Sequence, residues 1–210
     1  MGKTVLVFGA NGNVGSHFIN QALEAGYTIK AFVRNPKTYK LAGHQDVEVV
    51  KGDATNSQDI ESAMQGVDIV VSCLGNAMKK KIYIMDTAYD LILSIAAKQA
   101  KPPRCLMIST IGANGSSGFV RFLLRMIVGK EGFTDYEKAD QRALDEKQVP
   151  VVLIRPAGLT DKPGTGTYQV IDKSSVFFPK FITRSDVAKF FVDCLKDTSF
   201  DGRAVMIQGV

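Results

Sequence analysis

The sequence has few cysteines and histidines and no long apolar run, and each shortage excludes a class of protein. Its three cysteines are odd in number and widely spaced, which excludes a disulfide framework and a C-x-x-C metal pair. The two histidines, His17 and His44, form no metal-ligand cluster. No apolar stretch approaches the roughly 20 residues that span a bilayer, and nothing resembles a signal peptide. We therefore expect a cytoplasmic protein with reduced, buried thiols, no metal and no membrane partner.

Length and charge are those of an ordinary globular domain. The 210 residues are 45% hydrophobic and 22% charged, which allows one α/β domain with a sizeable core. The formal net charge of +5 suits an anionic ligand. The basic residues are nevertheless scattered, and the one short run, residues 79–81, is typical of a solvated loop. We therefore expect no nucleic-acid partner.

The chain begins with a buried strand, a glycine-rich turn and a helix. Residues 3–8 form a short β-branched run, as in the central strand of a parallel sheet. The next glycines have G-x-x-G-x-x-G spacing, in which Gly9 permits a tight turn, Gly12 lets a pyrophosphate approach and Gly15 lets the helix pack closely. The helix would point its free N–H groups at the phosphates. A plain strand–helix turn without a ligand is the alternative. The candidate phosphate-binding residues are Gly9, Asn11, Gly12, Asn13, Val14 and Gly15.

Strands and helices alternate along the first three-quarters of the chain, which predicts a doubly wound parallel sheet. Apolar runs predict strands at residues 3–8, 27–33, 47–51, 67–73, 105–109, 151–155 and 204–208. Helical spacing and a capping box at 183–186 predict helices at residues 14–23, 37–42, 57–64, 84–96, 119–128, 134–148 and 184–196. The chain is thus interpreted as a single α/β domain of the Rossmann type, residues 1–210, with helices on both faces. Substrate-side loops are expected at about 111–133 and 156–181.

The residue at the end of the second strand predicts which dinucleotide binds. In NAD-selective sites an acidic residue there, about 20 residues after the glycines, accepts hydrogen bonds from the ribose. Here the residue is Arg34, and a guanidinium can hold a 2′-phosphate with two charge-assisted hydrogen bonds. Each contributes about 1.5–3 kcal/mol, so NADP(H) is predicted to bind more tightly than NAD(H) by one or more orders of magnitude. The alternative is a solvated surface arginine.

Polar and small residues follow the other strands at the same edge. Ligands of open α/β sheets lie outside the carboxyl ends of the strands. Segment 53–54 would then lie beside the adenine, 74–76 beside the pyrophosphate and ribose, and 109–111 beside the nicotinamide, with 156–159 offering backbone groups to the carboxamide. Each segment could also simply end its strand, but their recurrence favours one cofactor groove. The residues are Asp53, Ala54, Leu74, Gly75, Asn76, Ser109, Thr110, Ile111, Pro156, Ala157, Gly158 and Leu159.

These motifs make the chain similar to the atypical short-chain dehydrogenase/reductase group, in particular to the NmrA-like proteins and the biliverdin-IXβ and flavin reductases. The matching pieces span nearly the whole chain: residues 9–15, 33–36, 52–54, 109–113, 155–156, 159–161 and 182–188. The resemblance implies a Rossmann fold that binds NADP(H) and reduces a flavin, quinone or tetrapyrrole-like acceptor. It also implies a histidine near the turn after the sixth strand, where this chain has Gly158.

The sequence does not identify a catalytic residue. Typical members of the superfamily use a tyrosine whose pKa is lowered by a lysine four residues later. Tyr136 lies in roughly the right helix, but Lys138 is only two residues on, and we expect no Tyr/Lys pair. Ser109 matches the superfamily's serine position, where it either hydrogen-bonds the ligand or has a structural role. The residues four positions after the six tyrosines are Ala31, Gly43, Thr87, Leu93, Asp140 and Asp172.

Reduction of an aromatic acceptor requires no such pair, because stacking supplies much of the catalysis and solvent can deliver the proton. We therefore predict an NADP(H)-dependent reductase of an acceptor such as a flavin or quinone, acting as a monomer or weak dimer. The alternative is a non-catalytic protein that senses the NADP⁺/NADPH balance. Candidate walls of the acceptor pocket, which could equally pack the core, are Phe119, Phe122, Phe177, Phe178 and also Phe181.

Overall fold

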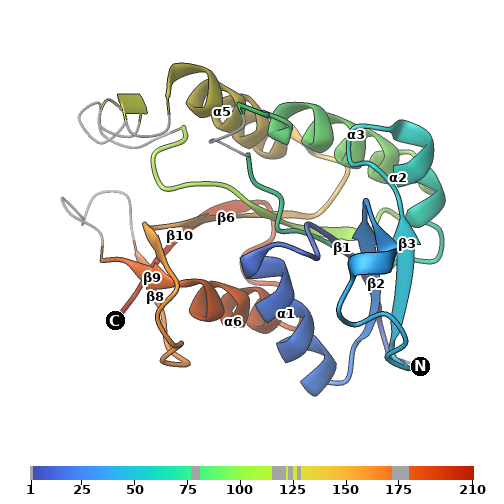
Figure 1. The fold of residues 1–210 in the computed structure, drawn as a ribbon. Helices are drawn as coiled ribbons and strands as arrows, with labels where there is room; N and C mark the ends of the chain where they lie inside the picture. The colour runs from blue at the N-terminus through green and yellow to red at the C-terminus, as the bar shows by residue number, and fades with distance from the viewer. Residues whose placement is uncertain (1, 77–80, 115–121, 123–124, 127–128, 172–179) are drawn as a thin grey trace.

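An eight-stranded sheet lies between two layers of helices (Figure 1). The computed structural model describes residues 2–76, 81–114, 122, 125–126, 129–171 and 180–210. The strand order is β3-β2-β1-β4-β5-β6-β10-β8. The strands are β1 (Thr4–Phe8), β2 (Thr28–Val33), β3 (Val47–Lys51), β4 (Ile69–Ser72), β5 (Arg104–Ile108), β6 (Val151–Pro156), β8 (Gln169–Ile171) and β10 (Arg203–Gln208).

The sheet is parallel except at one edge, where β8 runs antiparallel to β10. Strand β1 pairs with β2 on one side and with β4 on the other, so the winding direction reverses between β1 and β4. A separate short sheet joins β7 (Leu159–Thr160) to β9 (Ile182–Thr183). The predicted doubly wound Rossmann-type sheet is confirmed.

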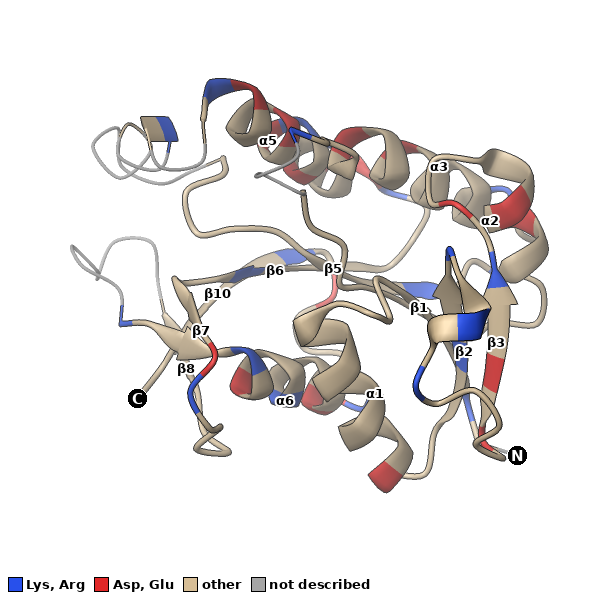
Figure 2. Ribbon diagram, in the orientation of Figure 1, with Lys and Arg blue, Asp and Glu red and all other residues tan. Residues whose placement is uncertain are grey.

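Helices cover both faces of the sheet. Figure 1 shows α1 (Asn13–Glu24) and α6 (Arg184–Cys194) on one face, and α2 (Ser57–Ala63), α3 (Met85–Ala97) and α5 (Lys130–Asp145) on the other. The α1 and α6 helices meet through Phe18 and Phe191, whose rings are 6.1 Å apart and nearly perpendicular. Figure 2 shows both signs of charge spread over the helices and loops rather than gathered on one face.

The central strands form the core because they are covered on both sides. Val5, Leu6, Val7 and Phe8 of β1 have no exposed surface, and all six residues of β6 are buried. Strands buried on both faces need continuous apolar runs rather than alternating ones, and these are the runs that the sequence shows.

Three predicted segments differ from the structure or lie outside it. The helix expected at 37–42 is wrong: the chain forms only a 3₁₀ turn, η1 (Pro36–Thr38), which Asn35 caps, because the chain becomes extended at Tyr39 and buries that side chain. The helix expected at 134–148 runs instead over Lys130–Asp145, since the Glu146 side chain accepts hydrogen bonds from the backbone N–H groups of Gln148 and Val149. Most of the helix expected at 119–128 lies outside the described residues.

Candidate functional site

The predicted site residues meet at one edge of the sheet, which we call the carboxyl rim. The carboxyl ends of β3, β2, β1, β4, β5 and β6 lie there side by side in that order. Because these strands are parallel, the segments that follow them leave the sheet on the same side as the start of α1 (Figure 1). In open α/β sheets this edge, at the reversal between β1 and β4, is where ligands bind.

The glycine turn after β1 is closely packed against its surroundings. Gly9 has φ +76°, and a Cβ there would lie 2.6 Å from the carbonyl oxygen of Cys73 on the β4 exit. A Cβ on Gly15 would lie 2.2 Å from the carbonyl oxygen of Gly9. The Gly12 N–H donates to that same oxygen at 2.8 Å. Side chains are thus excluded at Gly9 and Gly15 by backbone atoms, which fixes how α1 leaves the strand.

The start of α1 fits an anionic group. Gly12 occupies the N-cap position with no side-chain hydrogen bond, and the first turn contains no acidic residue. Asn11, Gly12 and Asn13 are exposed. By contrast, Asn56 caps α2 and Thr183 caps α6 through their side chains. The free N–H groups and positive dipole end of α1 therefore face solvent at the carboxyl rim, as phosphate binding requires.

Arg34 and Asp53 lie at the ends of neighbouring strands. The Gly52 N–H donates to the Val33 carbonyl at 3.0 Å, which joins the two strand ends. Hydrogen bonds from the hydroxyl and N–H of Thr55 lower the pKa of Asp53; burial opposes them, and the charge of Arg34 adds to them. Both charged side chains are exposed. The rim thus carries a cation and an oriented carboxylate where the ribose and adenine are predicted.

Asn76, on the loop after β4, is fixed by helix α5. Its N–H donates to the Tyr136 hydroxyl at 3.2 Å, and its side-chain amide donates to Asp135 at 2.8 Å. The same Asp135 carboxylate accepts the N–H groups of Met85 and Asp86 at the start of α3, while the Asn76 side chain accepts from Ile84. Asp135 therefore caps α3 from another helix and anchors the β4 exit. The sequence gives no signal of this, because Asn76 and Asp135 are 59 residues apart.

Tyr136 faces the carboxyl rim, and among the described residues its hydroxyl is bonded to the Asn76 N–H rather than to a lysine. Its hydroxyl lies 3.4 Å from where a Cβ on Gly75 would stand. Burial raises the pKa of Tyr136; the Asn76 hydrogen bond lowers it, and the nearby Asp135 charge raises it. Lys138 instead has a largely exposed side chain that pairs with Asp86 at 3.9 Å. Tyr136 is thus a neutral phenol at neutral pH, able to hold a hydrogen bond but not poised as a base.

Ser109, at the end of β5, belongs to a buried charged network. Its hydroxyl donates to Asp140 at 2.7 Å, and Asp140 also accepts two hydrogen bonds from Arg155 on β6. All three residues are buried, Asp140 completely. Because the Ser109 hydroxyl already donates its hydrogen bond to Asp140, it cannot also donate one to a ligand. These contacts match the structural alternative that the sequence left open.

The segment after β6 lies against the exposed aromatic ring of Phe181, which comes directly before β9. Pro156 and Ala157 are buried, whereas Gly158 is exposed and its carbonyl accepts the Ile182 N–H at 2.9 Å. A Cβ on Gly158 would lie 2.4 Å from the ring of Phe181, which is 71% exposed. Phe122 is 62% exposed. The other predicted walls, Phe119, Phe177 and Phe178, lie outside the described residues.

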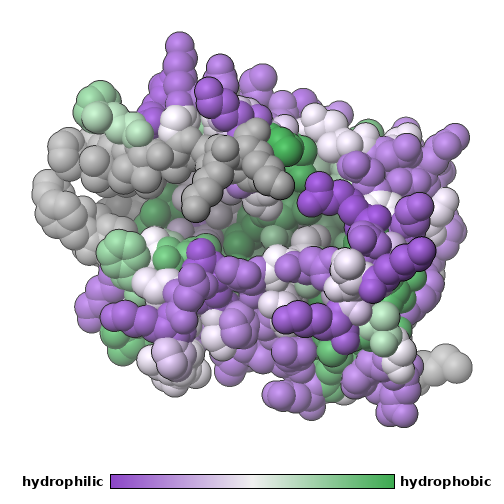
Figure 3. Space-filling model, in the orientation of Figure 1, coloured by the Kyte–Doolittle hydropathy of each residue, from purple (hydrophilic) through white to green (hydrophobic). Residues whose placement is uncertain are grey.

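The predicted cofactor residues divide into an open and a buried set. Those exposed or half-buried are Gly9, Asn11, Gly12, Asn13, Arg34, Asp53, Leu74, Gly75, Asn76, Thr110, Ile111, Gly158 and Leu159. Those buried are Val14, Gly15, Ala54, Ser109, Pro156 and Ala157. The buried set shapes the rim from beneath. Figure 3 shows hydrophobic residues lining a hollow in the face between the two helical layers.

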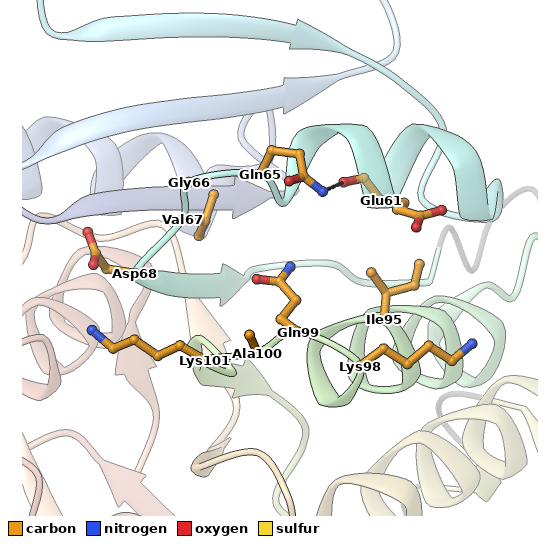
Figure 4. Close-up of a pocket in the computed structure, with 10 residues that line it drawn as sticks. All are labelled: Glu61, Gln65, Gly66, Val67, Asp68, Ile95, Lys98, Gln99, Ala100 and Lys101. Carbon is orange, nitrogen blue, oxygen red and sulfur yellow. Dashed lines mark hydrogen bonds between the residues drawn. The ribbon is translucent and has the colours of Figure 1, made fainter.

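A cavity of about 520 Å³ lies elsewhere, at the amino end of β4 and the carboxyl ends of α2 and α3 (Figure 4). Its lining mixes both charges with amides, as Asp68, Lys98 and Gln99 illustrate. It is at the opposite end of the strands from the predicted residues. It therefore has no part in the site at the carboxyl rim.

The described residues contain neither a metal-ligand cluster nor a membrane-spanning helix. No three histidine, cysteine, aspartate or glutamate side chains gather there as a metal ion would require. Over the same part of the chain, no helix has the length and hydrophobicity to cross a bilayer.

Comparison with known proteins identifies a family to which the chain belongs and solved structures that share its fold. A family model described as NAD(P)H-binding matches residues 9–198. The uncharacterised sugar epimerase YhfK of Bacillus subtilis is 26% identical over 212 residues, which cover 95% of this chain and 91% of YhfK. The anaerobillin reductase ChuY from Escherichia coli O157:H7 superposes with TM-score 0.81 at 20% identity, covering 98% and 97% of the two chains. A proposed NADH-flavin reductase from Streptococcus pneumoniae superposes with TM-score 0.79 at 16% identity and full coverage of both.

Proposed function

Because this chain belongs to the NAD(P)H-binding family, we propose that it is an oxidoreductase that uses NADP(H) to reduce a planar aromatic acceptor such as a flavin or quinone. The observation that carries the proposal is the start of α1, which is open, uncapped and free of acidic residues, at the same rim as the exposed guanidinium of Arg34. This combination suits a dinucleotide with an additional phosphate.

The rim residues divide the cofactor between them. The backbone of Asn11 to Asn13 would hold the pyrophosphate, and Arg34 the 2′-phosphate. Asp53 would lie beside the adenine, and the segment around Asn76 beside the ribose. Thr110, Ile111 and the segment after β6 would border the nicotinamide. The fixed position of Asn76 supports this arrangement, since two hydrogen bonds to α5 hold it against the rim before any ligand arrives.

When bound, NADPH supplies a hydride, which is a proton with two electrons, and the acceptor takes one further proton to complete its reduction. The chain's task is then to orient the acceptor and exclude water. The raised pKa of Tyr136 and the committed proton of Ser109 support a reaction in which solvent provides that second proton. An alcohol dehydrogenase or an epimerase would instead need an activated base at this position.

Two of the similar structures carry the names of reductases, one of anaerobillin and one of flavin. Both names agree with the reduction of a small molecule as the proposed class of reaction. The exposed ring of Phe181, beside Gly158 at the carboxyl rim, supports a planar aromatic acceptor independently, since rings of this kind stack on planar ligands.

The test has two arms. Calorimetric titration of the protein with NADP⁺ and NAD⁺ should show tighter binding of NADP⁺, and mixing the protein with NADPH and FMN or menadione should consume NADPH above the buffer rate. Absence of turnover with every acceptor would refute the reductase. If NADP⁺ and NADPH then bind with unequal affinity, a sensor of the NADP⁺/NADPH balance replaces it, a role favoured by the unactivated Tyr136.

A further inference from the structure

Among the described residues, six large hydrophobic side chains are exposed, and four of them lie between β4 and α3, between β5 and α5, or directly before β9. Phe181, before β9, is the most exposed of these four. The four are Ile82, Phe122, Met126 and Phe181. An isolated exposed apolar residue is ordinary on any protein surface. What distinguishes Phe181 is that the structure around it is shaped to hold it.

Two hydrogen bonds and one close approach of the backbone position the chain at Phe181. The Lys180 N–H donates to the buried side chain of Gln208 at 3.0 Å, and the Ile182 N–H donates to the Gly158 carbonyl at 2.9 Å. The Phe181 carbonyl oxygen lies only 2.3 Å from where a Cβ on Gly209 would stand. The chain is therefore fastened before, at and after this residue, while the ring projects to solvent.

Two glycines permit this arrangement, and neither is required by its own backbone conformation. Gly158 and Gly209 both lie outside the left-handed region in which glycine is favoured. A side chain on Gly158 would meet the ring of Phe181 at 2.4 Å, and one on Gly209 would meet its carbonyl. The ring thus fills the space that a side chain at position 158 would need. Where the family resemblance implies a histidine, this chain has Gly158 with the ring of Phe181 against it.

We propose that Phe181, held over Gly158, is the residue against which the planar acceptor stacks, and that it determines the selectivity for aromatic acceptors. This inference rests on the proposed function, because it places the acceptor at the carboxyl end of β6. Because the backbone on both sides of Phe181 is already fixed, only the side chain has to be ordered when a second ring stacks on it. Phe181 acts here by contact with the acceptor and takes part in no proton transfer.

The test compares the wild type with Phe181→Ala, Phe181→Tyr and Val170→Ala, the last removing an exposed apolar side chain from β8. FMN is titrated into each protein saturated with NADP⁺, and flavin fluorescence reports binding. Loss of one stacking partner should weaken FMN binding by about 10-fold or more in Phe181→Ala. Phe181→Tyr and Val170→Ala should match the wild type, and NADP⁺ affinity should stay unchanged in all.

A second variant tests the link between ring and glycine. Gly158→Ala should displace the ring and weaken FMN binding as strongly as Phe181→Ala, and the double variant should be no worse than either single one. Equal FMN affinity in Phe181→Ala and wild type would overturn the inference, whether or not the protein reduces FMN. Absence of NADPH consumption by the wild type would overturn the proposed reductase while leaving the binding comparison decisive for Phe181.

Discussion

Replacing Arg34 should remove the preference for the phosphorylated dinucleotide. Its guanidinium offers two charge-assisted hydrogen bonds, each worth about 1.5–3 kcal/mol. Because the side chain is exposed, solvent screens it, and we take the pair to contribute about as much as one such bond. At about 1.4 kcal/mol per tenfold change, Arg34→Ala should weaken NADP⁺ binding by about 10- to 100-fold. Arg34→Asp should go further and favour NAD⁺, because its carboxylate repels the phosphate and accepts the ribose hydroxyls.

Calorimetric titration of each protein with NADP⁺ and NAD⁺ measures the effect, with Lys98→Ala as control. Lys98 lies beside the cavity at the far end of the strands, so its removal changes the net charge equally without touching the rim. The wild-type preference should also shrink as salt is raised, since an exposed ion pair is screened.

The structure predicts one more effect of removing Arg34, which acts through Asp53. The charge of Arg34 contributes to the lowered pKa of Asp53, so the two groups are electrostatically coupled. Without Arg34, the Asp53 carboxylate repels a nearby phosphate uncompensated, and NADP⁺ should lose more affinity than NAD⁺. If Arg34→Ala binds the two dinucleotides with the wild-type ratio, the assignment of Arg34 to the 2′-phosphate is wrong.

Three other predictions concern the framework of the site. Gly15→Ala should cost about 1–3 kcal/mol in urea denaturation, because the new methyl group would lie 2.2 Å from the Gly9 carbonyl oxygen and only the backbone could yield. Asp140→Ala should cost about 3–5 kcal/mol, since it leaves Arg155 charged and buried without its partner. Asp186→Asn should flatten the acid side of the stability profile: burial raises the pKa of Asp186, but hydrogen bonds from Thr183, Thr165 and Gly166 together leave it below its usual 3.8. The wild type should therefore hold this contribution above about pH 4 and lose it as the pH falls through the lowered value.

Each of these predictions has a matched control. Gly12→Ala meets the same oxygen at 3.1 Å rather than 2.2 Å and should cost much less stability than Gly15→Ala. Ser109→Ala removes one hydrogen bond from Asp140 but keeps the ion pair, so it should cost only about 1 kcal/mol. Asp161→Asn removes a carboxylate whose side chain is 75% exposed and should lower the free energy of unfolding less than Asp186→Asn at neutral pH. Equal effects within any of these pairs would contradict the corresponding argument.

The strands were predictable because their signal is local. An apolar β-branched run of strand length identifies β3 to the residue, and the other parallel strands to within about two residues, without any knowledge of neighbours. The η1 turn could not be predicted in this way, because Tyr39 becomes buried only when the rest of the fold is present. The glycine turn and Arg34 stand where the spacing placed them, but their contacts with a cofactor stay predictions.

The contacts that organise the site could not be read from the sequence, because each joins distant residues. Ser109 meets Asp140 across 31 positions, and Asn76 meets Asp135 across 59. A Cβ on Gly158 would meet the ring of Phe181, a contact across 23 positions that spacing cannot reveal. From the sequence, these residues only end strands or lie in loops. In the folded chain, several of them are joined by hydrogen bonds to helix α5.

Helix α5 has a role that extends beyond covering the sheet. Its inner face binds the exits of three successive strands: Asp135 and Tyr136 bind the segment after β4, and Asp140 binds the residue after β5 and Arg155 near the end of β6. One rigid element thus sets the spacing between the exits of β4, β5 and β6. Under the proposed function, this spacing would decide how far apart the dinucleotide and the acceptor lie.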